Sequence, residues 1–127
     1  MKKSLLIVED DPDIRCGVEE ILTHEGYRVR TARNGQVALE ALRTQGEELP
    51  GLILLDLMMP VKDGYSFREE QSKDPGINHI PVVVMSAVPQ VNPDELNLAP
   101  QNLLRKPLDL SELFETVEYY LSDEKVH

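Results

Sequence analysis

Residues 5–13 read LLIVEDDPD, a short apolar run that ends abruptly in acidic side chains. Four consecutive apolar residues are typical of a buried strand, and Pro12 suits the first turn of a helix. Glu9 and Asp10 stand at the junction between the two. Asp11, directly before the proline, is better explained as the N-cap of the helix than as a metal ligand. The stretch therefore predicts a strand that leads into a helix and carries negative charge to its end.

The same order, strand and then helix, recurs along the chain. The apolar runs around positions 53 and 83 are continuous instead of alternating, as expected for strands that are covered on both faces. Segments with apolar residues at helical spacing lie between the runs. The predicted strands are LLIV (5–8), YRVRTA (27–32), LILLD (52–56), PVVVMS (81–86) and NLLR (102–105), and the clearest predicted helices cover 11–26, 34–46 and 109–121.

The last of these helices has the most regular apolar stripe. Asp109 and Glu112 are spaced like a capping box at its start. The residues predicted to form its buried stripe are Leu110, Leu113, Phe114, Val117 and Leu121.

Strand–helix alternation repeated five times predicts an α/β fold, in which a parallel sheet is covered by helices on both faces. In such sheets the ligand site lies at the carboxyl ends of the strands, where the strand order reverses. A chain of 127 residues fits one domain. We expect the domain to cover residues 1–122 and the last residues, 123–127, to form a C-terminal tail.

The composition excludes several classes of protein. The net charge of −10 disfavours binding to nucleic acid or to anionic membranes, and no apolar segment approaches the length of a bilayer span. Cys16 is the only cysteine, so an intramolecular disulfide is impossible. We expect this cysteine to be a small packing residue, and we expect a cytoplasmic location because nothing suggests an oxidising compartment.

Polar side chains follow the apolar strands at the predicted carboxyl edge of the sheet. Glu9 and Asp10 end the first strand, Asp56 the third, Ser86 the fourth, and Lys106 follows the fifth. Carboxylates brought this close repel one another unless one protonates or a cation binds. Hard oxygen ligands favour Mg²⁺, which keeps several waters and accepts a phosphate oxygen. The edge therefore predicts a magnesium site beside an aspartate that can act as a nucleophile toward phosphorus.

These motifs, taken in order, resemble the receiver domain of two-component response regulators, including the chemotaxis regulators. The resemblance rests on LIVEDD, TARNG, PGLILLDLMMPVKDG, VVVMSA and LLRKPLDLSELF, which together span nearly the whole chain. It implies a flavodoxin-like (βα)₅ fold with a doubly wound sheet in the order 2-1-3-4-5. It also implies a phosphoacceptor domain that takes its phosphoryl group from a histidine kinase or phosphotransfer protein and then changes its interaction with a downstream protein target.

The resemblance also implies a role for each matching residue. Asp56 is the expected phosphoacceptor and a Mg²⁺ ligand, with Asp10, Glu9 and the backbone carbonyl of Met58 as the remaining protein ligands. Ser86 and Lys106 are expected to bind the phosphoryl group. The Lys106–Pro107 peptide bond is expected to be cis, which only an X–Pro bond makes cheap. A receiver catalyses only its own phosphorylation and dephosphorylation, so we expect no enzyme that acts on other substrates.

Two regions depart from the family pattern. Residues 87–105 contain three prolines where a regular fourth helix is usual, so we expect a short or irregular helix near 93–98. Leu103 stands where the family has an aromatic switch residue. In the predicted third helix, Arg68 and Gln71 stand where leucines are usual. These changes leave the predicted chemistry intact and alter how phosphorylation would be communicated.

Two other functions compete with the receiver interpretation. The first is a protein-binding module that uses the same fold without phosphorylation, which the altered region 87–105 keeps open. The second is a Mg²⁺-dependent phosphohydrolase with an aspartyl nucleophile. Phosphatases of the haloacid-dehalogenase type need a second aspartate two residues after the first, where this chain has Met58.

Overall fold

The computed structural model describes residues 3–122, so the predicted tail at 123–127 lies outside the described residues. Strands and helices alternate as the sequence predicts, with most boundaries within one or two residues. The strands are β1 (Ser4–Val8), β2 (Arg28–Ala32), β3 (Ile53–Asp56), β4 (Val82–Ser86) and β5 (Leu103–Arg105). The α-helices are α1 (Pro12–His24), α2 (Gly35–Arg43), α3 (Gly64–Ser72) and α4 (Leu110–Leu121), and two 3₁₀ helices are η1 (Pro93–Leu96) and η2 (Pro100–Asn102).

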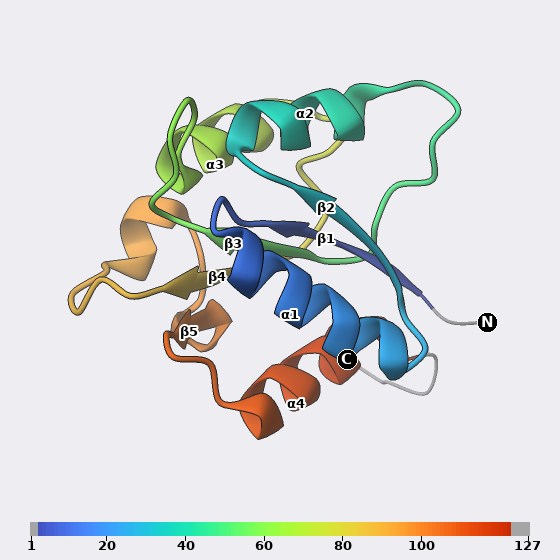
Figure 1. Cartoon of the computed structure of the whole chain (residues 1–127). Helices are drawn as coiled ribbons and strands as arrows, with labels where there is room; N and C mark the ends of the chain where they lie inside the picture. Colours follow the sequence, from blue (N-terminus) through green and yellow to red (C-terminus); the bar gives the residue numbers. More distant parts are fainter. Residues whose placement is uncertain (1–2, 123–127) are drawn as a thin grey trace.

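The five strands form one parallel sheet in the order β2-β1-β3-β4-β5, which confirms the predicted fold. Helices α2 and α3 cover one face of the sheet, and α1 and α4 cover the other (Figure 1). The strand order reverses between β1 and β3, so the crevice expected for a ligand lies beyond the carboxyl ends of these two strands.

Each face of the sheet has its own buried core. Leu6 and Val8 of β1 pack with Leu39 of α2 and Phe67 of α3 on one face. Leu5 and Ile7 of the same strand pack on the opposite face with apolar residues of α1 and α4, among them Leu22 and Leu113. Alternate residues of one strand thus enter different cores, which explains why the central strands are apolar throughout.

The helix starts are fixed by the polar residues that precede them. Asp11 accepts hydrogen bonds from the backbone N–H groups of Asp13 and Ile14, so its predicted role as N-cap is confirmed. Asp109 caps α4 in the same way, by accepting from the N–H of Glu112. Such caps satisfy backbone donors that would otherwise lack a partner, and they set the angle at which each helix leaves its strand.

The predicted short fourth helix is 3₁₀ rather than α. Asn92 caps η1 and Pro93 begins it, at the predicted start, but the helix ends at Leu96 instead of 98. Asn97 follows with a left-handed backbone (φ 56°), and Pro100 starts the second 3₁₀ turn. The prolines cannot supply the backbone N–H groups of a regular α-helix, so this segment remains two short turns.

Two predictions about packing are wrong. Cys16 is exposed on α1 instead of packing in the core. Leu110, expected on the buried stripe of α4, is 49% exposed, whereas Leu113, Val117 and Leu121 are buried. Both residues lie on helix faces that their neighbours do not fully cover. Within residues 3–122, no helix is long and apolar enough to cross a membrane.

Candidate functional site

The strand register brings the predicted acidic residues to one place. Val8 of β1 pairs with Leu55 of β3, so the next residues, Glu9 and Asp56, lie side by side beyond that pair. Carboxylate oxygens of Glu9, Asp10 and Asp56 all lie within 4.8 Å of one another. Glu9 is 1% exposed and Asp56 is 5% exposed, whereas Asp10 is accessible to solvent. Two of the three carboxylates are therefore held at a site with little water around them.

Lys106 brings the opposite charge to this cluster from the end of β5. Its backbone N–H donates to the carbonyl of Ser86 at 2.8 Å, which extends the pairing of β4 and β5 by one residue. Its Nζ lies 2.6 Å from Oε1 of Glu9 and 3.4 Å from Oδ1 of Asp56. The Lys106–Pro107 bond is cis, as predicted. The lysine thus lies between the two buried carboxylates, closer to Glu9.

The electrostatics of the cluster appear most clearly at Glu9. The pKa of this carboxyl group is raised to about 7: burial raises it most, the hydrogen bond from Lys106 lowers it, and the neighbouring Asp56 raises it again. Burial alone would lower the pKa of Lys106, but the hydrogen bond to Glu9 and the charge of Asp56 outweigh it, so the lysine pKa is raised. One lysine therefore compensates the buried negative charge only in part.

The carboxylates fit a divalent cation. Three carboxylate oxygens within 4.8 Å of one another, one of them open to solvent, match the few protein ligands and several waters that Mg²⁺ uses. The excess negative charge at Glu9 and Asp56 favours such an ion in the same place. The acidic cluster of Glu9, Asp10 and Asp56 is thus able to hold a metal ion.

Ser86 ends β4, and its carbonyl accepts the hydrogen bond from the N–H of Lys106. It is 3% exposed, and its Oγ accepts a hydrogen bond from the backbone N–H of Val88 at 3.0 Å. The side chain of Met58 is 61% exposed in the loop after β3. The proposed use of its backbone carbonyl as a metal ligand stays a prediction.

Leu103, at the expected position of the switch aromatic, is partly buried against the core that contains Val84 and Leu96. An aliphatic side chain here packs in place and has no polar tip that could change partners. The loss of an aromatic switch at this position stays a prediction from the sequence.

Arg15, which the sequence did not single out, and Gly64 both support the acidic cluster. A guanidinium nitrogen of Arg15 donates to the backbone carbonyl of Glu9 at 2.9 Å and to that of Asp10 at 3.4 Å. The N–H of Gly64 donates to the carbonyl of Leu57 at 2.9 Å and closes the loop after Asp56. An arginine one turn into a helix that follows an acidic pair is a sequence signal that could have identified Arg15.

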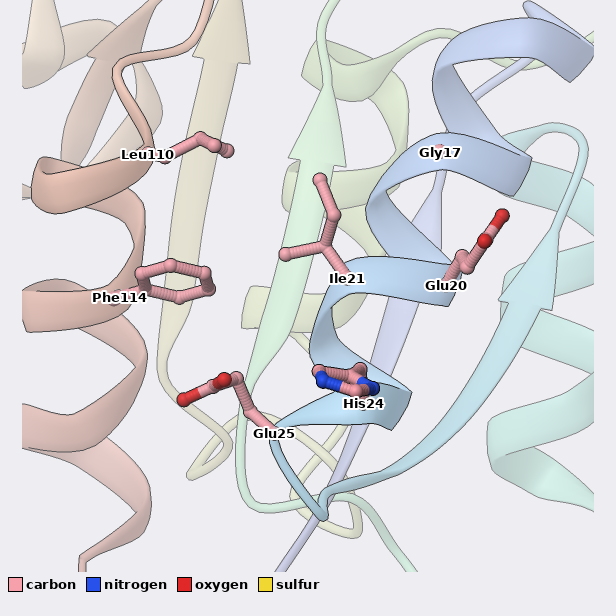
Figure 2. Close-up of a pocket in the computed structure, with 7 residues that line it drawn as sticks. All are labelled: Gly17, Glu20, Ile21, His24, Glu25, Leu110 and Phe114. Atoms are coloured by element: carbon pink, nitrogen blue, oxygen red, sulfur yellow. The ribbon is translucent and has the colours of Figure 1, made fainter.

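A separate groove lies between α1 and α4. It encloses about 540 Å³ and is lined by Gly17, Ile21, Leu110 and Phe114, with charged residues at its rim. Figure 2 shows Leu110 and Phe114 of α4 facing Ile21 of α1 across it. An adjoining hollow of about 300 Å³ extends from the same helices to Lys106 and Pro107. The half-exposed Leu110 is explained by its place on this groove.

The fold and the site define a class of protein: a doubly wound α/β domain with an acidic cluster and a lysine at the carboxyl edge of its sheet. Residues 5–118 match the family model of the response regulator receiver domain. The chain belongs to this family and is a receiver domain of the two-component response regulators.

Individual relatives agree with this assignment. The chain is 39% identical over 90 residues to the probable transcriptional regulator ycf27 of Pyropia yezoensis and 36% identical over 120 residues to the response regulator PleD of Caulobacter vibrioides. These alignments cover 71% and 92% of the chain but only 35% and 26% of the two relatives. The chain thus spans about a third or less of the length of these relatives.

A solved structure of similar extent is the receiver domain of the sensor histidine kinase PA1611 from Pseudomonas aeruginosa PAO1, which has a magnesium ion coordinated in its active-site cleft. It matches with a TM-score of 0.78 and 28% identity, over 94% of this chain and 98% of that one.

Proposed function

We propose that this domain accepts a phosphoryl group on Asp56 and that the modification changes its contacts with a partner protein. The observation that carries the proposal is the position of the Asp56 carboxylate, which lies in a cluster with Glu9 and Asp10 and 3.4 Å from the ammonium of Lys106. A carboxylate between a cation site and a lysine can reach phosphorus while both positive charges compensate the oxygens being transferred.

The transfer is a displacement at phosphorus. An oxygen of the Asp56 carboxylate forms a bond to the phosphorus of a phosphohistidine on the donor, and the bond from that phosphorus to the imidazole nitrogen breaks. The imidazole leaves with the electron pair and takes a proton from solvent. Lys106 and the hydroxyl of Ser86 would bind the phosphoryl oxygens of the resulting acyl phosphate, a role supported by their positions at the ends of β5 and β4. Water later hydrolyses the acyl phosphate and restores the carboxylate.

Glu9, Asp10, Asp56 and the backbone carbonyl of Met58 would hold Mg²⁺ in this scheme. When bound, the ion supplies Lewis-acid stabilisation of the phosphoryl oxygens. The chain's own contribution is to keep Glu9 and Asp56 buried and close to each other, so that ion binding relieves their repulsion.

The proposed partners are a histidine kinase or phosphotransfer protein as donor and an unidentified protein as target, with no part for nucleic acid or membrane in this domain. The domain accepts and releases its own phosphoryl group and turns over no other substrate. The cytoplasmic location and the domain limits of 1–122 stay predictions from the sequence.

A small-molecule phosphodonor with Mg²⁺ tests the proposal without a kinase. Intact-mass measurement should show one added phosphate on the wild type and none on Asp56→Asn. Asp63→Asn is the matched control, because Asp63 lies on the same loop and only caps α3, a role that asparagine also fills. Absence of the adduct from the wild type, or equal labelling of Asp56→Asn, would contradict the proposal.

The structure does not support the competing function as a phosphohydrolase. Its second aspartate would have to stand at Met58, whose exposed thioether side chain cannot donate or take up a proton. Turnover of a generic phosphate ester by the wild type would revive that function. A phosphorylation-independent binding module would bind its partner equally well as wild type and as Asp56→Asn.

A further inference from the structure

An arginine of α3, Arg68, donates hydrogen bonds to the segment that follows Ser86. Nε of Arg68 donates to the carbonyl of Leu96 at 3.0 Å, and a terminal nitrogen of the same guanidinium donates to the carbonyl of Asn97 at 3.1 Å. These two carbonyls lie at the carboxyl end of η1, where an isolated turn leaves acceptors without intrahelical partners. Arg68 thus bonds the end of η1 directly to α3.

Arg68 is itself fixed by a buried glutamine one turn further along α3. Its second terminal nitrogen donates to Oε1 of Gln71 at 2.7 Å, and Gln71 is fully buried. The amide nitrogen of Gln71 donates in turn to the carbonyls of Ile77 and Ile80, at 3.0 and 3.1 Å, in the connection to β4. Both ends of the amide are therefore satisfied, and the glutamine cannot turn without losing hydrogen bonds in a dry environment.

The acceptors of Arg68 are all neutral: two backbone carbonyls and an amide. Its side chain is half-buried, and burial lowers its pKa, although a guanidinium stays charged. Because no opposite charge attracts the guanidinium, these bonds depend on the exact position of the acceptors. A shift of η1 by about 1 Å away from Arg68 would break the bonds to Leu96 and Asn97.

The chain from Ser86 to η1 is also held by Leu96, which is buried in the core, and by two hydrogen bonds nearer to Ser86. The Oγ of Ser86 accepts from the N–H of Val88, and a guanidinium nitrogen of Arg105 donates to the carbonyl of Pro89 at 2.8 Å. If Ser86 rotates toward a phosphoryl group on Asp56, Val88 must follow it or lose this hydrogen bond. Pro89 and Pro93 restrict the backbone between Val88 and Leu96, so a displacement at Val88 is passed on toward η1.

We propose that Arg68 is a positioning residue that holds the segment 87–97 in its unphosphorylated arrangement, and that its bonds to Leu96 and Asn97 are broken when the phosphoryl group is bound. This inference rests on the proposed function and names the regulation of the same site. A residue that bonds only one of two states shifts the equilibrium between them. In this chain, Leu103 replaces the switch aromatic. The hydrogen bonds of Arg68 supply the difference in contacts between the two states.

The test measures binding of beryllofluoride, a phosphoryl analogue, in the presence of Mg²⁺. Arg68→Met keeps the apolar stem of the side chain and removes the hydrogen bonds, so it should raise the apparent affinity for beryllofluoride about three- to tenfold. Arg68→Lys, which can reach one carbonyl, should lie between. Lys73→Met removes the same charge from the exposed end of α3 and should leave the affinity unchanged.

Hydrogen exchange of the Leu96 and Leu98 amides supplies the second readout. Beryllofluoride should accelerate exchange in the wild type, and Arg68→Met should exchange fast before any is added. An unchanged or lower affinity in Arg68→Met contradicts the proposal, because an arginine that only supports the fold would weaken binding or leave it as it was. If the wild type binds no beryllofluoride, the proposed function fails first, and the role of Arg68 in its regulation fails with it.

Discussion

Nζ of Lys106 lies 2.6 Å from Oε1 of Glu9 but 3.4 Å from the phosphoacceptor candidate Asp56. The lysine therefore compensates the glutamate more than the aspartate. A cation that binds Glu9 would compete with this pairing and leave the lysine for the oxygens at Asp56. Mg²⁺ binding, lysine position and proton uptake at Glu9 are thus linked.

The pKa of Glu9 makes this linkage measurable. With a pKa of about 7, this carboxyl group is ionised in about one molecule in ten at pH 6 and nine in ten at pH 8. Mg²⁺ affinity should therefore rise about tenfold between these pH values, with release of a proton, as measured by titration calorimetry in buffers of different ionisation enthalpy. Glu9→Gln should bind Mg²⁺ more weakly and with little pH dependence over this range. Equal affinity of the wild type at pH 6 and pH 8 would contradict the linkage.

The same carboxyl group sets the direction in which stability changes with pH. The pKa of Glu9 in the folded protein, about 7, lies above its ordinary value of 4.5. In the pH window between these two values the folded protein keeps a proton on Glu9 that the unfolded chain has released. The free energy of unfolding without metal should therefore fall as the pH rises from about 5 to about 7.5, and Mg²⁺ should restore it most at the upper end. The pKa of Lys106 is raised above its ordinary value of 10.5, so this group leaves the window unaffected.

Asp56→Asn should stabilise the protein in the absence of metal. The substitution removes one carboxylate from a cluster that a single lysine compensates only in part. Relief of the repulsion with Glu9 is worth about 1–2 kcal/mol at pH 8 and less at pH 6, where Glu9 is mostly protonated. Urea denaturation of wild type, Asp56→Asn and the control Asp63→Asn measures the difference. A loss of stability in Asp56→Asn alone would show that the lysine contact with Asp56 outweighs the repulsion.

Substitution of glycine by alanine should destabilise the protein at Gly64 and stabilise it at Gly17. A Cβ at Gly64 would lie 2.8 Å from the carbonyl oxygen of Asp56 and 2.8 Å from Cα of Leu57, both backbone atoms. Gly64→Ala should therefore cost about 1–3 kcal/mol and displace the loop beside Asp56, which weakens Mg²⁺ binding as well. A Cβ at Gly17 meets nothing within 4 Å, so Gly17→Ala in α1 should stabilise by about 0.5–1 kcal/mol. Thermal unfolding of both variants checks the two signs together.

Val61 has a backbone that a β-branched residue rarely adopts. Its φ is 70°, in the left-handed region, and its side chain is 82% exposed, so little packing offsets the strain. Val61→Asn should raise the free energy of unfolding by about 1 kcal/mol, because asparagine tolerates this conformation. Chemical denaturation measures this gain in the free energy of unfolding. Val61→Ala is the control, because alanine lacks the tolerance of asparagine for this conformation and should stabilise the protein less. If Val61→Asn is less stable than wild type, the valine makes contacts that outweigh its strain.

The sheet and its acidic edge could be predicted because each depends on local pattern. A continuous apolar run that ends in a charge identifies both a buried strand and the residue at its carboxyl end, as at Leu55 and Asp56. In a parallel sheet those ends meet at one edge, whatever the exact register. The N-caps at Asp11 and Asn92 are equally local, since each side chain bonds the backbone two or three residues further on.

The predictions that needed contacts between distant segments were wrong or missing. Helical periodicity assigned Leu110 to a buried stripe, but α1 leaves that end of α4 partly uncovered. It also assigned Cys16 to the core, which the α1 face bearing that residue does not reach. The polar residue Gln71 is buried because two carbonyls from the connection to β4 accept its amide hydrogens.

The most direct test of the central claim is to locate the acyl phosphate on the chain. The wild type is treated with a small phosphodonor and Mg²⁺ and then with borohydride, which reduces an aspartyl phosphate to homoserine and leaves free carboxylates unchanged. Peptide mass spectrometry should find homoserine at position 56 and at no other acidic residue of the cluster. Homoserine at Glu9's neighbour Asp10, or no reduced residue in a protein that binds Mg²⁺, would contradict the assignment of Asp56 as the phosphoacceptor.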